Sequence, residues 1–428
     1  MKEFNSVIGY DKIKEELYIL CDIIKNTDKY KKLGVTIPKG LLLYGKPGVG
    51  KTTMAKCFIE ATGVKNVYTI RKNKDKKELI KHIKDTFKMA NQNNPCIIFL
   101  DDFDKFSNED YYHRNTQEYV TIQSCIDECC ENVFVIGTAN DINKLPNSLL
   151  RVGRFDNKFE FGNPCLKDAK KIIKYYLKNK QVEDNLNLLE IAKILNGGSC
   201  ADLEAIINLA GIYAGNDRRE KISQNDIIKA ALRIIMEAPE SLSNKNKDII
   251  ERIAVHEAGH AVMLELLSPN NLTIVSILQY ESSSGGITST IRDPDYFLSK
   301  LKQENDIKIG LAGRAATEIV YGILDMGSDS DYNRAENILR DHIDNDWEFD
   351  FGSNYNDSEE INKRNQIICQ IELKRLYDLT KRILIENRAF LDEVTKELLN
   401  KDFLVRKDMD EVKSRVNIIP VSQIYVSE

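Results

Sequence analysis

Three short, mainly apolar runs in the first third of the chain are flanked by polar and turn-forming residues. They cover Pro38–Tyr44, Cys96–Leu100 and Val133–Ala139. Mainly apolar runs of this length are typical of strands buried on both faces of a parallel sheet. A helical segment, Thr53–Glu60, follows the first run, and strands that alternate with helices predict an α/β fold. We therefore expect residues 1–163 to form a first domain around a parallel sheet.

Downstream of this region the pattern changes to helical periodicity. The segment Lys167–Leu232 is largely helical by spacing, with glycine-containing breaks near residues 197 and 216. A polar stretch then precedes an apolar helix that begins near Asp248 and stops before Pro269, because proline ends a helix. The pattern predicts a multi-domain chain, α/β followed by α, with a first domain at 1–163, a helical lid at 164–238, a linker at 239–247 and a last domain at 248–428.

A glycine-rich segment joins the first apolar run to the helix that follows it. Its residues 45–52, Gly-Lys-Pro-Gly-Val-Gly-Lys-Thr, match the phosphate-loop pattern G-x-x-x-x-G-K-[ST]. In that pattern backbone amides hold the phosphates, the lysine reaches the β and γ oxygens, and the hydroxyl ligates Mg²⁺. The strand–loop–helix context favours a nucleotide site over a chance match in a turn. The predicted site for ATP and Mg²⁺ comprises Gly45, Pro47, Gly48, Val49, Gly50, Lys51, Thr52 and Thr53.

The other two apolar runs end in polar residues. Asp101 and Asp102 follow the second run, and Asn140 follows the third. Parallel strands bring their carboxyl ends to one edge of the sheet. We therefore expect Asp101 to hold the Mg²⁺ shell, Asp102 to polarise the attacking water, and Asn140 to sense the γ-phosphate. Arg151 and Arg154 lie in a nearby turn and are either arginine fingers for a neighbouring subunit or solvated surface residues; their spacing leaves both open.

The segment 254–261, Ala-Val-His-Glu-Ala-Gly-His-Ala, places the motif H-E-x-x-H in an apolar helix. Residues i and i+4 share a helix face, so His256 and His260 can hold one Zn²⁺ from the same side. Glu257 is then the base that takes a proton from the metal-bound water. The alternative is a buried helix with two hydrogen-bonded histidines. The phosphate loop far upstream favours the metal site, because it indicates that the chain is an enzyme.

The composition limits the class of protein. Of 428 residues, 42% are apolar and 30% are charged, and the net charge of −5 gives no reason to expect a nucleic-acid partner. No apolar stretch approaches the ~18 residues that cross a bilayer, so we expect no membrane span. Nine cysteines without a Cys-x-x-Cys pair favour reduced thiols and a cytoplasmic location. A membrane-tethered parent protein stays open if the chain is a fragment.

The order of these motifs resembles a known family. The phosphate loop, the acidic strand end, Asn140 and the segment Arg151–Asp156 resemble the AAA+ ATPases, as do Val7–Leu17 and Gly198–Leu203. With the H-E-x-x-H motif, the whole chain resembles the FtsH-type ATP-dependent metalloproteases, without their usual N-terminal membrane anchor. The resemblance implies an AAA+ nucleotide-binding domain with a helical lid, a mainly helical zinc metallopeptidase domain, a homo-hexameric ring, and the unfolding and threading of protein substrates.

A catalytic zinc needs three protein ligands, and the histidines supply two. The segment Met326–Ala335 opens a helix, and the resemblance implies that its Asp331 is the third ligand. From the residues alone, Asp329 or Asp331 could equally cap the helix. Glu318 is the second candidate, either as a ligand or as a carboxylate beside the ligands. The segment Leu311–Glu318 resembles the family's helix beside the site.

Other segments concern substrates and energy coupling. Gly285–Thr290 is typical of an exposed strand, which in the family pairs with the substrate backbone; an ordinary sheet edge gives the same pattern. Three features depart from the family. Asp102 replaces a glutamate, Arg71–Glu78 is a lysine-rich loop without the family's aromatic pore residue, and Asn108–Asn132 lacks the family's Asp-Gly-Phe signal.

The leading hypothesis is an ATP-dependent zinc endopeptidase that forms a ring and degrades unfolded or weakly folded proteins. A first alternative is a zinc peptidase whose ATPase domain hydrolyses slowly and mainly regulates or assembles the ring. A second alternative is a protein remodeller that does not degrade its clients. The intact motif at His256, Glu257 and His260 argues against this last alternative.

Overall fold

The structure is a computed structural model, and the chain divides into two compact units. The first unit contains Met1–Gln181 and Gly197–Leu209, and the second contains Val182–Asn196 and Ala210–Glu428. This division passes through the expected helical lid, and the domain boundaries given above stay a prediction. The residues that the structure describes are 2–72, 75–106, 116–236, 246–278, 286–290, 299–323, 329–344 and 359–425. Within these ranges, no helix combines the length and the apolar character that crossing a membrane requires.

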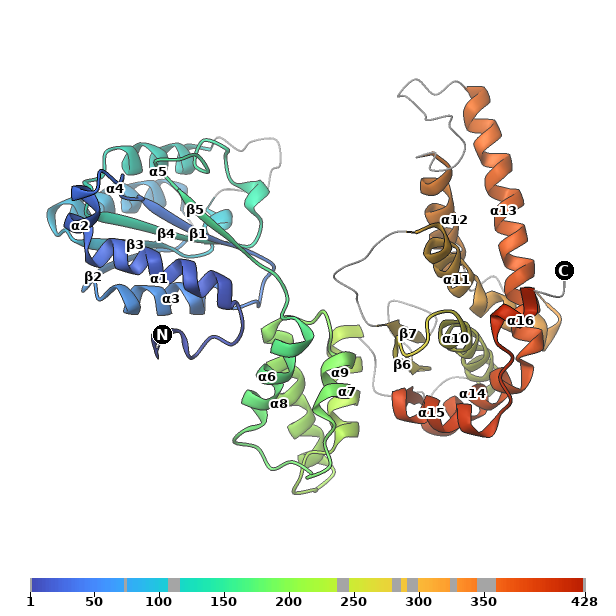
Figure 1. Cartoon of the computed structure of the whole chain (residues 1–428). Coiled ribbons are helices and arrows are strands. Elements are labelled where there is room, and N and C mark those ends of the chain that lie inside the picture. Colours follow the sequence, from blue (N-terminus) through green and yellow to red (C-terminus); the bar gives the residue numbers. More distant parts are fainter. Residues whose placement is uncertain are drawn as a thin grey trace. The chain divides into compact units, whose positions relative to one another are not determined.

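The first unit is built on a five-stranded sheet with the order β2-β3-β4-β1-β5 (Figure 1). Every neighbouring pair in this sheet is parallel. The expected strands at Cys96–Leu100 and Val133–Ala139 are confirmed residue for residue. The strands are β1 (Gly40–Gly45), β2 (Asn66–Ile70), β3 (Cys96–Leu100), β4 (Val133–Ala139) and β5 (Asn157–Phe161).

Helices cover both faces of this sheet, and alternate strand residues face them. On one face, Ile98 and Val135 pack with buried residues of α4 and α5. On the other face, Ile97 and Ile136 pack with buried residues of α1 and α3. This three-layer arrangement confirms the predicted α/β class. The helices are α1 (Asp11–Lys25), α2 (Thr27–Lys32), α3 (Lys51–Thr62), α4 (Lys76–Gln92), α5 (Gln117–Asp127) and α6 (Leu166–Leu177).

The start of α8 lies directly on the phosphate loop. The backbone amide of Ala201 donates to the carbonyl oxygen of Gly48 over 3.0 Å. A β-carbon at Gly48, where φ is +78°, would lie 2.6 Å from the Ser199 hydroxyl oxygen, so this position needs glycine both for its backbone and for its space. The helices of this helical region are α7 (Leu188–Ile194), α8 (Cys200–Asn216) and α9 (Gln224–Met236).

The second unit is mainly helical around the apolar helix α10 (Lys247–Leu267), which agrees with the predicted helix near Asp248. A small antiparallel sheet with the order β7-β6-β8 lies beside it. Its strands are β6 (Leu272–Ser276), β7 (Ile287–Thr290) and β8 (Phe403–Val405). Besides α7, α9 and α10, this unit contains α11 (Lys300–Tyr321), α12 (Asp329–Asp344), α13 (Glu359–Glu386), α14 (Arg388–Lys401), α15 (Arg406–Arg415) and α16 (Val421–Tyr425).

Two features fix α10 within this unit. A β-carbon at Gly259 would lie 2.5 Å from the carbonyl oxygen of Ala312, so glycine is what allows α10 and α11 to approach closely. Near the end of α10, the fully buried carboxylate of Glu265 accepts from Arg406 over 2.6 Å and from Lys413 over 2.8 Å. A buried charge with two cationic partners is satisfied, and it ties α15 to the end of α10.

The lysine-rich loop predicted at Arg71–Glu78 is shorter than expected. Strand β2 ends at Ile70, and α4 already begins at Lys76. The reason is a local cap, because the Asp75 side chain accepts from the backbone amide of Lys77 over 2.8 Å. Residues 73 and 74 of this connection lie outside the described residues, as do 108–115 of the linking stretch Asn108–Asn132.

Candidate metal centre and nucleotide site

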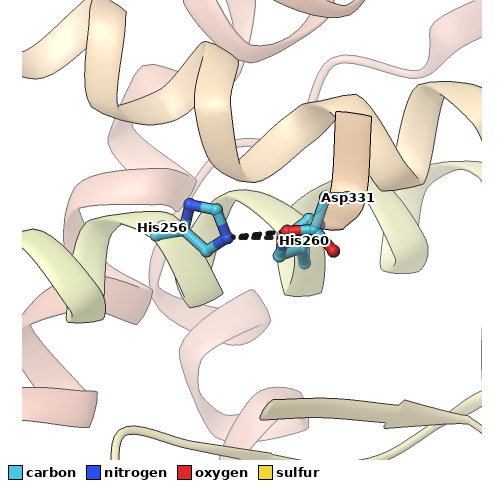
Figure 2. A group of neighbouring side chains, drawn as sticks. All are labelled: His256, His260 and Asp331. Atoms are coloured by element: carbon cyan, nitrogen blue, oxygen red, sulfur yellow. Dashed lines mark hydrogen bonds and ion pairs between the residues drawn. The ribbon is translucent and has the colours of Figure 1, made fainter. Parts of the chain in front are cut away.

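Two histidines of α10 and one aspartate of α12 converge on a single point. His256 Nε2 lies 3.0 Å from His260 Nε2, and Asp331 Oδ2 lies 3.1 Å from the former and 3.3 Å from the latter. Figure 2 shows the three side chains pointing toward one another from the two helices. Among the described residues, these three form the cluster of ligand-type side chains that could hold a metal ion.

The donor set fits a tetrahedral zinc. Two ligand atoms about 2.0–2.1 Å from Zn²⁺ at tetrahedral angles are about 3.3 Å apart, close to the separations found here. The Nδ1 atom of His260 lies 2.7 Å from the carbonyl oxygen of Ile309, which can only accept, so Nδ1 carries the proton and Nε2 keeps its lone pair. Facing ring nitrogens beside a carboxylate need a cation or a proton between them. Zinc ligands of this kind meet that requirement.

The charges at this point perturb one another. Burial raises the pKa of the Asp331 carboxyl, but hydrogen bonds from His256 and His260 outweigh it, and the pKa lies well below its ordinary value. Burial lowers the pKa of His260, but the Asp331 and Glu257 carboxylates outweigh this effect and raise it. Both shifts have one cause, which is that anionic carboxylates surround the imidazoles. The same arrangement stabilises a bound cation.

Helix α11 shapes the centre through a glycine that the sequence did not single out as functional. A β-carbon at Gly313 would lie 2.5 Å from Nε2 of His256 and also 2.5 Å from Nε2 of His260. Glycine is therefore what leaves room for both rings. The signal was present in the small residues of the segment 311–318, but a sequence does not show which of them faces the histidines.

Glu257 follows the first histidine and is 4% exposed. Burial raises the pKa of its carboxyl above the ordinary value, while the neighbouring His260 and His256 lower it in part. The hydroxyl of Thr288 donates to its Oε2 over 2.9 Å. A carboxylate with a raised pKa beside a metal position is a suitable general base. Thr288 could not be assigned to Glu257 from the sequence, because it lies 31 residues further along the chain and the contact forms only when β7 packs beside α10.

Glu318, the second candidate for the third ligand, has other partners. Its Oε1 accepts from Lys381 over 2.8 Å, and its Oε2 accepts from the hydroxyl of Tyr377 over 2.7 Å. These partners lower its pKa against the effect of burial. Glu318 therefore links α11 to α13, and it is not a member of the metal-type cluster. Asp331 lies in the first turn of α12, as expected for the segment that opens this helix.

The nucleotide site assembles at the carboxyl ends of β1, β3 and β4. The Lys51 ammonium donates to Asn140 Oδ1 over 2.9 Å and to the carbonyl oxygens of Gly45 and Lys46 over 2.7 Å each. Burial lowers the pKa of Lys51, and the carboxylates of Asp104 and Asp102 partly oppose this. The lysine of the loop and the strand-end asparagine are thus brought together, as their positions predicted.

A second pair of residues in this site has the arrangement that Mg²⁺ requires. The Thr52 hydroxyl lies 3.1 Å from Asp101 Oδ1, which also accepts from Thr138 over 3.0 Å. Arg71 lies 3.0 Å from the other oxygen of this carboxylate. A hydroxyl beside an acidic strand end is the pair that holds Mg²⁺ in phosphate-loop enzymes. Thr52 and Asp101 thus lie side by side, and their role toward Mg²⁺ stays a prediction.

Both sites match known families. The model of the ATPase family associated with various cellular activities (AAA) matches residues 41–163, and the model of peptidase family M41 matches residues 240–347. The ATP-dependent zinc metalloprotease FtsH of Lachnoclostridium phytofermentans is 31% identical over 96% of this chain and 74% of its own length. The chain belongs to the FtsH-type ATP-dependent zinc metalloprotease family.

Other FtsH proteins are similar over nearly the whole chain. FtsH 2 of Thermoanaerobacter sp. is 29% identical over 98% of this chain and 84% of its own length. FtsH of Bacillus subtilis is 29% identical over 97% of this chain and 70% of its own length. The AAA match contains Lys51, Asp101 and Asn140, and the M41 match contains the three metal-type residues. The cofactors of an FtsH-type enzyme, Zn²⁺ and ATP with Mg²⁺, thus fit the two donor sets.

Asp102 of this FtsH-type chain has an unusual backbone conformation. Its φ is +54°, a region that aspartate tolerates better than most residues. Its amide donates to Thr138 over 3.0 Å, and its carboxylate lies 2.9 Å from the Lys105 ammonium. The amide nitrogen of Asn140 is 3.5 Å from Oδ1, at the limit of a hydrogen bond. The carboxylate therefore lies in the site, but a lysine holds it.

The two candidate arginine fingers differ in their surroundings. Arg151 is exposed. Arg154 is bound within the chain, where its Nε and one terminal nitrogen donate to the two carboxylate oxygens of Asp127 over 2.9 and 2.8 Å, and the other terminal nitrogen donates to the carbonyl of Ser148. A bidentate pair of this kind orients a guanidinium. The role of both arginines toward a neighbouring subunit stays a prediction.

Proposed function

We propose that the chain hydrolyses peptide bonds at a zinc held by His256, His260 and Asp331, with Glu257 as the general base. The observation that carries this proposal is the convergence of the two Nε2 atoms and Asp331 Oδ2 within 3.0–3.3 Å. A catalytic zinc takes three protein ligands and leaves a fourth position for water. The cluster supplies three donors, and membership of the M41 family supports their use.

The proposed chemistry assigns one task to each side chain. Zinc, when bound, lowers the pKa of its water and polarises the peptide carbonyl. Glu257 takes the proton from the attacking water and delivers it to the leaving amine. Burial raises the pKa of this carboxyl, and a raised pKa favours the uptake of a proton from the water. The bond from His260 Nδ1 to Ile309 holds the imidazole in the tautomer that leaves Nε2 free to bind metal.

We further propose that ATP hydrolysis drives delivery of substrate to this centre. Lys51 would bind the β- and γ-phosphates, Thr52 and Asp101 would hold Mg²⁺, and Asn140 would sense the γ-phosphate. The 2.9 Å bond between Lys51 and Asn140 supports this assignment, because it brings the lysine of the phosphate loop together with the asparagine at the end of β4. Arg151 and Arg154 would complete the site of the next subunit. This role requires a ring, and the homo-hexamer of the resembled family is the proposed form.

The proposed substrates are unfolded or weakly folded proteins. The connection between β2 and α4 is short and lysine-rich, with no aromatic residue to grip an apolar chain. Asp102 carries one methylene less than glutamate, and Lys105 binds its carboxylate. Both features favour slow threading. Strand β7 is at the edge of its sheet, where an extended peptide can pair with it in any sequence.

Digestion of casein with and without ATP tests this function, with phosphate release measured in parallel. We expect the wild-type chain to degrade casein and to release phosphate. Glu257→Gln should release phosphate and leave casein intact. Lys51→Ala should release no phosphate, and ATP should no longer increase its degradation of casein. Degradation by Glu257→Gln at the wild-type rate contradicts the proposed base, and casein that survives the wild-type enzyme contradicts the proposed protease.

A further inference from the structure

Strand β7 and the general base are in direct contact. The Thr288 hydroxyl oxygen lies 2.9 Å from Oε2 of Glu257 and 3.4 Å from the backbone oxygen of the same residue. A hydroxyl has one hydrogen, and this hydrogen points to the acceptor that is closer and charged, which is the carboxylate oxygen. Thr288 therefore donates to the Glu257 carboxylate. The hydroxyl comes from the edge strand of the sheet, and the carboxylate comes from helix α10.

The backbone of this strand is fitted to Glu257 as well. Thr288 pairs with Val275 of β6, which fixes the register of β7. Two residues earlier, a β-carbon at Gly286 would lie 2.6 Å from Cγ of Glu257 and would overlap the carbonyl oxygen of Ser276. Glycine is the residue that lets the chain pass between the glutamate and β6. Two residues therefore contact the base: Gly286, directly before β7, leaves room for its side chain, and Thr288 of β7 donates a hydrogen bond to it.

The hydrogen bond has a consequence for proton transfer. A carboxylate has two oxygens, and only one of them needs to face the attacking water. The Thr288 hydroxyl occupies Oε2, which leaves Oε1 to accept the proton. It also restricts rotation about the last torsion of the glutamate, which is otherwise broad. A general base is effective only within hydrogen-bond reach of the proton that it takes, so the orientation of this carboxylate affects the rate directly.

We propose that Thr288 is a positioning residue that holds the Glu257 carboxylate in its reactive orientation and couples it to the register of β7. The proposal rests on the proposed function, because it concerns the base of that reaction. The coupling to β7 follows because the Thr288 hydroxyl belongs to this strand. Any shift of β7 along β6 moves Thr288 away from Oε2. The strand that offers its edge to a peptide therefore also controls the orientation of the Glu257 carboxylate.

The test compares Thr288→Val, which keeps the shape and loses the hydroxyl, with Thr288→Ser, which keeps the hydroxyl. We measure kcat and KM on a fluorogenic peptide, together with zinc content. Thr288→Val should lower kcat about 10- to 100-fold, the effect of losing one hydrogen bond to a charged group, with KM and zinc content near the wild-type values. Thr288→Ser should recover most of kcat. Thr273→Val is the matched control, because its hydroxyl bonds the Ser289 carbonyl of the same strand without contacting Glu257.

A second measurement does not depend on activity. In crystals of Thr288→Val, the Glu257 carboxylate should take more than one orientation, and in Thr288→Ser it should take one. Wild-type kcat in Thr288→Val, a serine variant as slow as the valine variant, or an effect on KM alone would each overturn the proposal. An equal loss in Thr273→Val would assign the effect to the strand as a whole. If the wild-type chain cleaves no peptide, or Glu257→Gln cleaves it, the proposed function fails instead.

Discussion

Gly313 lies so close to His256 that a β-carbon on the glycine would be 2.5 Å from the Nε2 atom of the histidine. The same β-carbon would be 2.5 Å from Nε2 of His260. Real β-carbons do not approach a ring nitrogen to this distance, so either the rings or α11 would have to move. The metal centre therefore depends on a residue that supplies no ligand atom.

Gly313→Ala is predicted to weaken zinc binding while leaving α11 helical, because alanine favours a helix but its methyl group occupies the space between the rings. We expect an affinity loss at least as large as the roughly 10- to 100-fold typical of changes around metal ligands. Gly310→Ala is the control on the same helix, since its β-carbon would meet nothing closer than 3.8 Å. Zinc titration that gives equal affinities for both variants would contradict this reasoning.

Alanine variants of Asp331 and Glu318 show which of these two residues is the third zinc ligand. Asp331→Ala removes a donor atom and should reduce zinc affinity by more than the roughly 100-fold upper value for outer residues. Glu318→Ala should keep one zinc per chain, because its carboxylate bonds Lys381 and Tyr377. Metal analysis after gel filtration measures both. Full zinc retention in the Asp331 variant would remove it from the ligand set.

Arg154 and Asp127 test whether the arginine acts within its own chain or on its neighbour. Arg154→Ala is predicted to lower ATP turnover by about 10³-fold or more, the usual effect of losing an arginine finger, with little change in nucleotide affinity. Asp127→Ala removes the intrachain partner and should reduce turnover much less. If both variants lose turnover equally, the bidentate pair itself is what hydrolysis needs. A monomer with full activity, detected by light scattering, would exclude action in trans.

Asp102 offers a change that should increase activity. Asp102→Glu lengthens the carboxylate by one methylene, and a correction of about 1 Å in the position of a catalytic group can change a rate roughly 10²-fold. We therefore expect faster phosphate release, up to about that factor. Lys105→Ala releases the present carboxylate from its ion pair and should also raise the rate, by less. No increase in either variant would show that this carboxylate does not limit hydrolysis.

The three central strands β1, β3 and β4 could be predicted because each carries its own apolar signal, whereas the edge strands β2 and β5 are more exposed and carry none. Cys96–Leu100 is apolar along its whole length and Val133–Ala139 is apolar except for Thr138, since helices cover both faces. The loop before α4 was predicted too long, because charged residues suggest a solvated loop and the cap at Asp75 lets the helix begin within them. Local patterns identify elements, and capping decides where they begin.

The site residues that lie close together in the sequence could also be predicted, whereas those brought together by packing could not. His256, Glu257 and His260 follow from spacing on one helix. Asp331 lies 75 residues beyond His256, and only the resemblance to a family connected them. Thr288 and Gly313 could not be found from spacing, because their roles come from contacts that form when β7 and α11 pack on α10. Sequence periodicity describes one helix face and does not show what other elements bring to it.

Removal and return of the metal tests the central claim most directly. The chain is dialysed against a chelator, and cleavage of an unfolded protein is measured as zinc is added back. We expect cleavage to disappear without zinc and to return in full at one zinc per chain, and we expect Asp331→Ala not to recover at this stoichiometry. Cleavage that persists in the metal-free chain, or recovery of Asp331→Ala with the wild-type zinc dependence, would contradict a catalytic zinc between His256, His260 and Asp331.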